Sequence, residues 1–296
     1  MNSSFDAGGQ FAWDGTSLDT LEACPRKYYY RHVMNAVPAG TSVHLLFGSL
    51  YATALETFYS LRARGDSIEA ALHAVVKLAL RQSWGQTFDH PAKTRMNLIR
   101  TIIWYVDEFA EESEDGLRTY HLADGSAAVE LSFTLEFSPD FLYCGHLDRV
   151  VQYGDALYWM DQKTTGGAIT PRFFADFKPR TQFLGYTWAG QSILHSPVKG
   201  GVIDAAQIAV GFSNFARDFI TFTQSQIEEW KESALYWMHA GRDFFQRGFF
   251  PMNLASCGNY GGCPYRTLCA RSPSIRENYL QSEYKTIAPW DPLKAR

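Results

Sequence analysis

Apolar residues recur three and four positions apart through much of the first third of the chain. This spacing places them on one face of a helix and predicts helices at 43–63, 67–83 and 94–112. Another helix is expected at 17–34, interrupted near the segment CPRKYYY. The pattern therefore predicts a mainly helical part over 17–125.

After residue 126 the apolar residues fall in short runs that are typical of strands. The runs AAVELSFTLEF, FLYCGHLDRVV and DALYWMDQKT are separated by the turn sequences SPD and YGD. Three neighbouring strands with such short connections predict an antiparallel meander.

The pattern then returns to helical spacing before a second pair of strands. A helix is expected at about 180–195, a strand around AQIAVGFSNF at 206–215, a short strand at DFITFT and a long helix at 226–247. Ser225 and Glu228 predict a capping box at the start of that long helix. The cysteine-rich segment that follows is expected to be an irregular loop.

Composition narrows the class of protein. The chain has 296 residues, of which 46% are hydrophobic, and this is enough for a substantial core. No run approaches 18 unbroken apolar residues, and the first residues lack both a basic and an apolar region. We expect a soluble cytoplasmic protein with no membrane partner.

The net charge of -4 argues against a general polyanion binder. Any contact with nucleic acid must then come from local basic segments. Two candidates are PRKYYYRH at 25–32 and PRFFADFKPR at 171–180.

Charged residues end the two middle strands, where apolar side chains would fill a core. A hairpin that turns at QYGD with a two- or four-residue loop pairs residues whose numbers sum to an odd value. Asp148 then shares a face with Asp161 and Lys163. Two neighbouring carboxylates repel each other unless a cation lies between them, and Mg²⁺ favours carboxylate and carbonyl oxygens. Lys163 would orient a metal-bound water or stabilise charge on a phosphate.

The same residues also allow a purely structural interpretation. Asp148 would form a salt bridge with Lys163 or Arg149 on a solvated sheet face, and DQK would be an ordinary strand end. The surrounding sequence has to decide between the two.

The surrounding sequence resembles the PD-(D/E)XK nuclease superfamily, in particular its RecB-type branch. GHLDRV followed by MDQKTT is similar to the G-x-x-D strand and (D/E)-x-K strand of that core. The helix segment TQFLGYTWAG offers Gln182 and Tyr186 at the Q-x-x-x-Y positions. Upstream, LDTLEACPRKYYYRHV and FGSLYATALE resemble the Cys-Pro-basic-aromatic segment and the G-x-x-H helix. The resemblance spans 17–269 in the expected order.

One position departs from the family pattern. Tyr51 stands where the G-x-x-H helix usually has His, and a neutral phenol is a poor metal ligand. The resemblance then implies a metal shell of Asp148, Asp161 and the Gln162 carbonyl. Glu130 and Glu56 are further candidates, although each is also an ordinary surface residue, and Tyr51 also fits simple helix packing.

Four of the five cysteines follow a second pattern of the resemblance. Iron–sulfur members of this branch have one cysteine before the core and three after it, as Cys24, Cys257, Cys263 and Cys269 are placed. This implies a [4Fe–4S] cluster that ties the chain ends together. Both gaps are five residues long, whereas the family's first gap is shorter. A Cys₄ zinc site and four unrelated cysteines stay open as alternatives, and Cys144 is expected to be a small core residue.

The resemblance implies an α/β fold with a central mixed sheet flanked by helices, formed as a single nuclease domain over 1–296. Its parts would be a helical part at 17–125, a nuclease core at 126–250 and a cluster segment at 251–275 packed with Cys24. The implied activity is metal-dependent hydrolysis of DNA with Mg²⁺ or Mn²⁺. The preferred form is an exonuclease that acts on single strands or free ends. It would be a stand-alone nuclease of the kind that a phage or mobile element encodes. Gln182 and Tyr186 would contact the strand near the cut. The alternative is a non-catalytic DNA- or partner-binding protein with the same fold and cluster.

Overall fold

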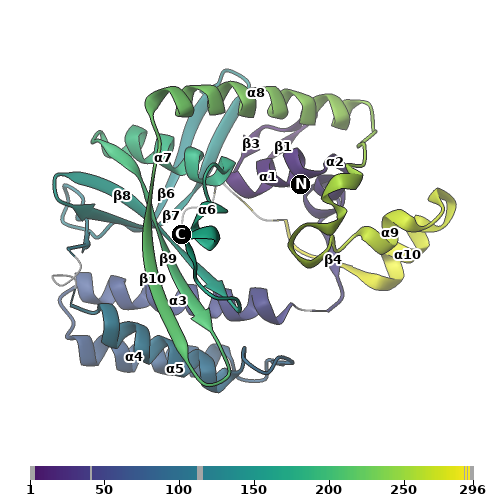
Figure 1. Ribbon diagram of the computed structural model, residues 1–296. Coiled ribbons are helices and arrows are strands. Elements are labelled where there is room, and N and C mark those ends of the chain that lie inside the picture. Colours follow the sequence, from purple (N-terminus) through teal and green to yellow (C-terminus); the bar gives the residue numbers. More distant parts are fainter. Residues whose placement is uncertain (1–3, 41, 112–115, 290, 292, 294–296) are drawn as a thin grey trace. The chain divides into compact units, whose positions relative to one another are not determined.

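The computed structural model describes residues 4–40, 42–111, 116–289, 291 and 293 (Figure 1). The chain forms two compact units. The first unit comprises the described residues of 1–41, 132–145 and 225–295, and the second those of 42–131 and 146–224. Strands β6 (Val129–Ser138) and β7 (Phe141–Tyr153) contribute residues to both units. The single-domain organisation stays a prediction.

The second unit is built on a mixed sheet. Its strand order is β10-β9-β8-β7, and β5 pairs with β7. The bounds are β5 (Arg118–Thr119), β8 (Ala156–Thr165), β9 (Val198–Ile208) and β10 (Ser213–Thr221). β8 and β9 are parallel, whereas β7–β8 and β9–β10 are antiparallel. The expected α/β class with a mixed sheet is confirmed.

Helices lie on both faces of this sheet. The predicted helices of the first third are confirmed as α3 (Val43–Ala63), α4 (Ile68–Gln82) and α5 (Arg95–Phe109). They lie side by side in Figure 1, where α3 crosses behind β9 and β10. The connection from β8 to β9 contains α6 (Pro171–Ala175) and α7 (Thr181–Leu194). Trp159 of β8 stacks on Phe183 of α7, whereas Gly48 of α3 approaches Thr164 of β8. Because alternate strand residues point to opposite faces, α7 and α3 cover opposite faces of β8.

The strand predicted at 206–215 is wrong. These residues span the end of β9, a turn at 209–212 and the start of β10, with Ala209 N–H bonded to the Phe212 carbonyl. The apolar run continues through the turn, so hydrophobicity alone conceals the break. Asn97 and Arg100 of α5 donate to the Ala209 carbonyl and hold the turn in place.

A buried polar network joins α5 to β9 and β10. Arg217 Nε donates to Asp204 Oδ1 over 3.1 Å, and Tyr105 donates its hydroxyl to Asp204 Oδ2. A second Arg217 nitrogen lies 2.8 Å from the Tyr105 oxygen, and the Tyr59 hydroxyl lies 3.2 Å from it. Each buried charge here has a partner of opposite sign, as burial requires.

The first unit begins with short strands and an interrupted helix. The predicted break is confirmed, because α1 ends at Ala23 and Cys24 is extended before Pro25 starts the next helix. Its elements up to residue 40 are β1 (Phe5–Asp6), β2 (Gly9–Gln10), β3 (Ala12–Trp13), α1 (Gly15–Ala23), α2 (Pro25–Tyr28), the π-helix η1 (Tyr29–Val33) and β4 (Ala36–Pro38).

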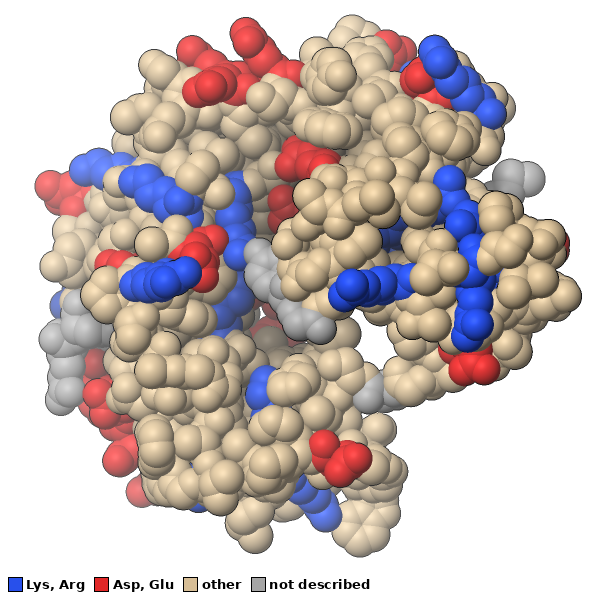
Figure 2. All heavy atoms as spheres, turned by 45° about the vertical axis from the view of Figure 1, so that its right-hand side comes forward, with Lys and Arg blue, Asp and Glu red and all other residues tan. Residues whose placement is uncertain are grey.

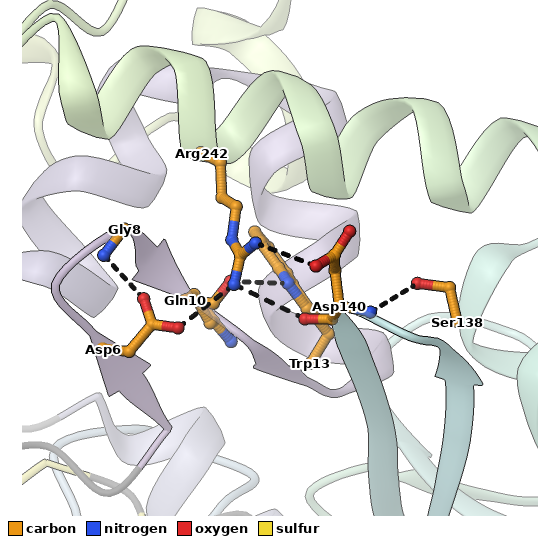
Figure 3. A network of polar contacts seen from close by, with 7 residues as sticks. All are labelled: Asp6, Gly8, Gln10, Trp13, Ser138, Asp140 and Arg242. Atoms are coloured by element: carbon orange, nitrogen blue, oxygen red, sulfur yellow. Dashed lines mark hydrogen bonds and ion pairs between the residues drawn. The ribbon is translucent and has the colours of Figure 1, made fainter.

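The long helix α8 (Gln224–Gln246) confirms the helix predicted at 226–247. It begins before Ser225, so the predicted capping box of Ser225 with Glu228 is wrong. Figure 3 shows Arg242 of α8 bonded to Asp6 over 3.1 Å and close to Asp140. These contacts join α8 to the first strands and to the turn before β7.

The cysteine-rich segment is not an irregular loop, and that expectation is wrong. It contains the 3₁₀ helix η2 (Leu254–Gly261), α9 (Arg266–Ala270), the 3₁₀ helix η3 (Pro273–Ile275), α10 (Arg276–Glu283) and β11 (Tyr284–Thr286). Asn253 caps η2, and β11 pairs with β4. Such short elements have no periodic pattern that a sequence could reveal. No helix of the described residues is both long and apolar enough to cross a membrane.

Candidate active site

The hairpin of β7 and β8 has the predicted register. Its paired residues run from Arg149 with Met160 to Tyr153 with Ala156, so their numbers sum to 309. The turn has two residues, and Gly154 adopts the left-handed backbone (φ 57°) that such tight turns need. The same register places Asp148 opposite Asp161, on one face of the sheet.

The strands separate just beyond the last pair. There the Asp148 carboxylate reaches across to β8 and accepts the N–H of Gln162 over 3.4 Å. Both carboxylates and the Gln162 backbone thus lie where the hairpin opens.

Lys163 forms an ion pair with Asp161, which confirms that the two side chains share a face. The Asp161 side chain is 3% exposed, whereas that of Lys163 is 29% exposed. The ammonium also lies 5.5 Å from the centre of the Phe183 ring in α7. The site therefore has a buried acidic side and a cationic side that reaches solvent.

Negative charge at this site is poorly compensated. Burial and the neighbouring Asp161 carboxylate raise the pKa of Asp148 to about 7, and Lys163 only partly opposes them. The predicted cost of placing two carboxylates together is therefore present in the metal-free protein.

Glu130 is the residue that sequence reasoning undervalued. Its charge is among those that raise the pKa of Asp148, and its backbone has φ 49°, which is rare for a residue with a side chain. Residues held in this region often lie at functional sites. Nothing in the segment AAVELSF signals the left-handed backbone.

Gln182 and Tyr186 lie on the side of α7 that faces the site. Gln182 Nε2 donates to the Tyr186 hydroxyl over 3.0 Å, as the spacing of four residues allows. The Tyr186 ring contacts Trp159, whose indole N–H bonds to Thr187 over 2.9 Å. Trp159 precedes Asp161 by two residues on β8 and points to the same face. The structure thus brings Gln182 and Tyr186 to the face that carries Asp161 and Lys163.

Tyr51 lies in a different environment. It is 1% exposed, and its ring packs edge-on against Tyr105. Burial raises the pKa of its phenol well above the usual value, and the charges acting on it are those of Asp204, Tyr59 and Arg217. The position therefore favours helix packing over metal binding.

The oxygen atoms of the site can be compared with the ligands that a hard divalent ion prefers. Two carboxylates and a backbone carbonyl are the oxygen ligands that Mg²⁺ takes, with water completing the shell. Within the described part of the chain, no three His, Cys, Asp or Glu side chains lie together as a metal site. The residues thus fit an open oxygen site that keeps several waters.

The first unit brings the four cysteines of the predicted cluster near one another. Cys24, Cys257 and Cys263 line one cavity of about 230 Å³. Burial raises the pKa of the Cys269 thiol, Arg26 lowers it, and Cys263 and Cys24 raise it, so Cys269 lies close to them.

The cavity does not by itself establish a cluster. All five cysteines are free, and the described residues contain no group of three ligands arranged for one metal ion. Cys144 is buried and its thiol donates to the Trp13 carbonyl over 3.2 Å, as expected of a core residue.

Two solved structures are similar over most of this chain. A protein from Eubacterium rectale described as a "putative exonuclease" is 11% identical, with a TM-score of 0.49, over 90% of this chain and 91% of its own. The protein SSO0001 is also 11% identical, with a TM-score of 0.33, over 88% of this chain and 85% of its own. No curated protein matches.

A family model matches far more of the chain than the site alone. The model of the PD-(D/E)XK nuclease superfamily matches residues 15–270. This range includes the carboxylate hairpin, α7 and the four cysteines. The chain belongs to the PD-(D/E)XK nuclease superfamily.

Proposed function

We propose that the protein is a metal-dependent deoxyribonuclease that hydrolyses phosphodiester bonds, and that it acts as an exonuclease. The observation that carries this proposal is the placement of Asp148, Asp161 and Lys163 on one face where β7 and β8 separate. Family membership supports the reaction class, and the preference for DNA ends rests on the resemblance of the sequence motifs.

The residues divide the chemistry among them. Asp148, Asp161 and the Gln162 carbonyl would hold Mg²⁺ or Mn²⁺, and Glu130, whose charge acts on Asp148, is a candidate for a further oxygen. A divalent ion at this position supplies Lewis-acid chemistry and lowers the pKa of bound water. Lys163 would donate hydrogen bonds to the attacking water or to the phosphate oxygens.

The reaction is a displacement at phosphorus. Water adds to the phosphorus atom, the bond to the leaving oxygen breaks, and a proton ends on that oxygen. Gln182 and Tyr186 would bind the strand beside the reacting phosphate, since they lie on the same face as Lys163. Their hydrogen bond to each other fixes both side chains before the substrate arrives.

A basic segment runs directly into this face. Arg172, Lys178 and Arg180 precede α7, and the first two are exposed. On the face shown in Figure 2, basic side chains form several separate groups, with mostly uncharged residues between them. The basic segment before α7 and the separate basic groups on the surface both support contact with a phosphate backbone at local positions.

The test is cleavage of end-labelled single- and double-stranded DNA with and without Mn²⁺. Wild type should release label from the ends only with the metal. Lys163→Met should lose cleavage, whereas Lys199→Met, which removes an exposed lysine of β9, should keep it. DNA binding without cleavage by wild type would instead support the non-catalytic alternative.

We propose further that Cys24, Cys257, Cys263 and Cys269 hold a [4Fe–4S] cluster. The shared cavity and the electrostatic contact of Cys269 with Cys24 and Cys263 support it. Anaerobically purified protein should contain about four irons per chain, and Cys263→Ser should lose them while Cys144→Ala keeps them. Stoichiometric zinc without iron would support the zinc alternative, and absence of both metals would contradict any metal site.

A further inference from the structure

A group of cationic side chains lies at the start of α3, away from the carboxylate hairpin. The rings of His44 and His90 meet at 5.1 Å, and Lys93 Nζ lies 5.7 Å from the centre of the Phe47 ring. His44 and Phe47 belong to the first turns of α3, whereas His90 and Lys93 belong to the loop before α5.

Lys93 is the unusual member of this group. Its residue is 3% exposed, yet within the described part of the chain its ammonium has no hydrogen bond or ion pair. Burial lowers its pKa, and no carboxylate opposes that shift. Its ammonium is not among the fully buried polar atoms, so a buried stem carries it to the surface. A cation held there without a counter-ion is suited to an anionic ligand.

The loop is built to hold Lys93 in place. His90 Nδ1 accepts the N–H groups of Ala92 and Lys93 over 3.1 and 3.0 Å, and Asn97 donates to the Ala92 carbonyl over 2.6 Å. With Nδ1 accepting, the proton of a neutral His90 ring is on Nε2, where it can be donated to a ligand.

The helix start adds a second source of positive potential. The first N–H groups of α3 have no partner within the helix, and the Ser42 side chain does not cap them. Helix N-termini of this kind bind phosphate. His44 is exposed beside these groups, and burial, Lys93 and His90 all lower its pKa.

The position in the fold links this group to the strand that carries the site. Gly48 lies one turn after His44, and a side chain added at Gly48 would meet Thr164 Oγ1 at 3.4 Å. Thr164 directly follows Lys163 and points to the opposite face of β8, which ends at Thr165, so a bound strand would pass round the end of β8 from the α7 face to the start of α3. Four residues of helix rise about 6 Å, and three residues of strand from Asp161 to Thr164 span about 10 Å.

We propose that Lys93, His44, His90 and the first turn of α3 form a phosphate-binding site that holds the substrate strand a few nucleotides from the reacting phosphodiester. The identity of the ligand as a nucleic-acid strand rests on the proposed nuclease function. The ability of the site to bind an anion does not depend on that function. The site would set the length of substrate strand that is bound beyond the carboxylate hairpin.

The first experiment uses inorganic phosphate and needs no nuclease activity. Phosphate, compared with chloride at equal ionic strength, should raise the melting temperature of wild type and of Lys77→Met, which loses an exposed lysine of α4. Lys93→Met keeps the stem over Phe47 but should lose this shift, and the exposed change His44→Gln should reduce it.

The second experiment measures binding of a fluorescent single-stranded oligonucleotide in Ca²⁺ without cleavage. Lys93→Met should bind about tenfold more weakly, because a hydrogen bond to a charged group is lost. Its salt dependence should fall by about 0.7 in log–log slope, the value for one phosphate contact on a single strand. In wild type, a neutral methylphosphonate should weaken binding at one position, and Lys93→Met should be insensitive at that position.

The outcomes separate the two claims. Phosphate stabilisation of wild type but not of Lys93→Met, without oligonucleotide binding, would keep the anion site and overturn the nucleic-acid ligand. Oligonucleotide binding that is equal in wild type, Lys93→Met and His44→Gln would overturn the inference and leave the proposed nuclease intact. If Lys93→Met melts too low to assay, His44→Gln alone decides by the same two readouts.

Discussion

Two buried aspartates on neighbouring strands of the second unit have opposite surroundings. Asp204 of β9 is bonded by Arg217 and Tyr105, so its charge is matched inside the fold. Asp161 of β8 faces Asp148, and among the described residues its ion pair is with the partly exposed Lys163. Both residues are almost fully buried, at 2% exposed. A buried charge that has a buried partner of opposite sign stabilises the fold. A buried charge without such a partner implies that a ligand binds there.

The opposite faces of the strands explain how the two sites coexist. Asp204 is in register with Gln162, the residue between Asp161 and Lys163. Alternate residues of β8 therefore serve an aromatic network on the side of α3 and α5 and an open acidic site on the side of α7.

The largest expected effect is on activity. Asp161→Asn should lower DNA cleavage at least about a thousandfold, because metal binding supplies several kcal/mol of transition-state stabilisation. Asp155→Asn, an exposed change in the turn of the same hairpin, should cleave like wild type. Initial rates of end-labelled DNA hydrolysis check this. Similar rates for Asp161→Asn and Asp155→Asn would remove the hairpin from the active site.

The next largest effect is on stability, and it belongs to the matched site. Arg217→Met should lower the free energy of unfolding by about 3–5 kcal/mol, because it leaves the Asp204 carboxylate buried without its partner. Lys163→Met should cost much less, since that side chain reaches solvent. Urea unfolding of both variants checks this. Equal losses would show that the two aspartates do not differ as described.

Removing the unmatched charge should stabilise the metal-free protein. The pKa of Asp148 is about 7 in the folded protein and about 4 when unfolded, so its ionisation opposes folding. Asp148→Asn should therefore gain on the order of 1–3 kcal/mol above pH 7. The gain should shrink as pH falls from 7 and vanish below about pH 4, where Asp148 is protonated in both states. Denaturation in EDTA at several pH values checks this, and a gain that is constant with pH would contradict it.

The smallest effect concerns Glu130. Glu130→Gly should raise the free energy of unfolding by roughly 1 kcal/mol, because glycine adopts φ 49° without strain. Glu130→Ala is the matched control, since it removes the carboxylate and keeps the strain. Both should weaken Mg²⁺ binding if Glu130 contributes an oxygen. Equal stability of the two variants would mean that the backbone at Glu130 stores no strain.

The sequence predicted the elements that depend on residues close to one another along the chain. The helices α3, α4 and α5 and the hairpin of β7 and β8 follow from apolar periodicity and turn residues. The odd-sum register was enough to place Asp148 on the same face as Asp161. The (D/E)-x-K motif was therefore predictable because its residues are close in sequence.

Features that depend on distant contacts were not predictable. The turn at 209–212 is held by Asn97 and Arg100, more than one hundred positions away. The Asp204 network and the electrostatic contact between Glu130 and Asp148 likewise join separate elements. The sequence left the role of Tyr51 open between the motif position and helix packing, and its contact with Tyr105 across separate helices favours packing.

The most direct test is a calorimetric titration of Mg²⁺ into wild type, Asp161→Asn and Asp155→Asn. If the unmatched carboxylates form the metal site, wild type and Asp155→Asn should bind Mg²⁺ with the same affinity, and Asp161→Asn should lose the heat of binding. Equal Mg²⁺ binding by Asp161→Asn and wild type would contradict the account.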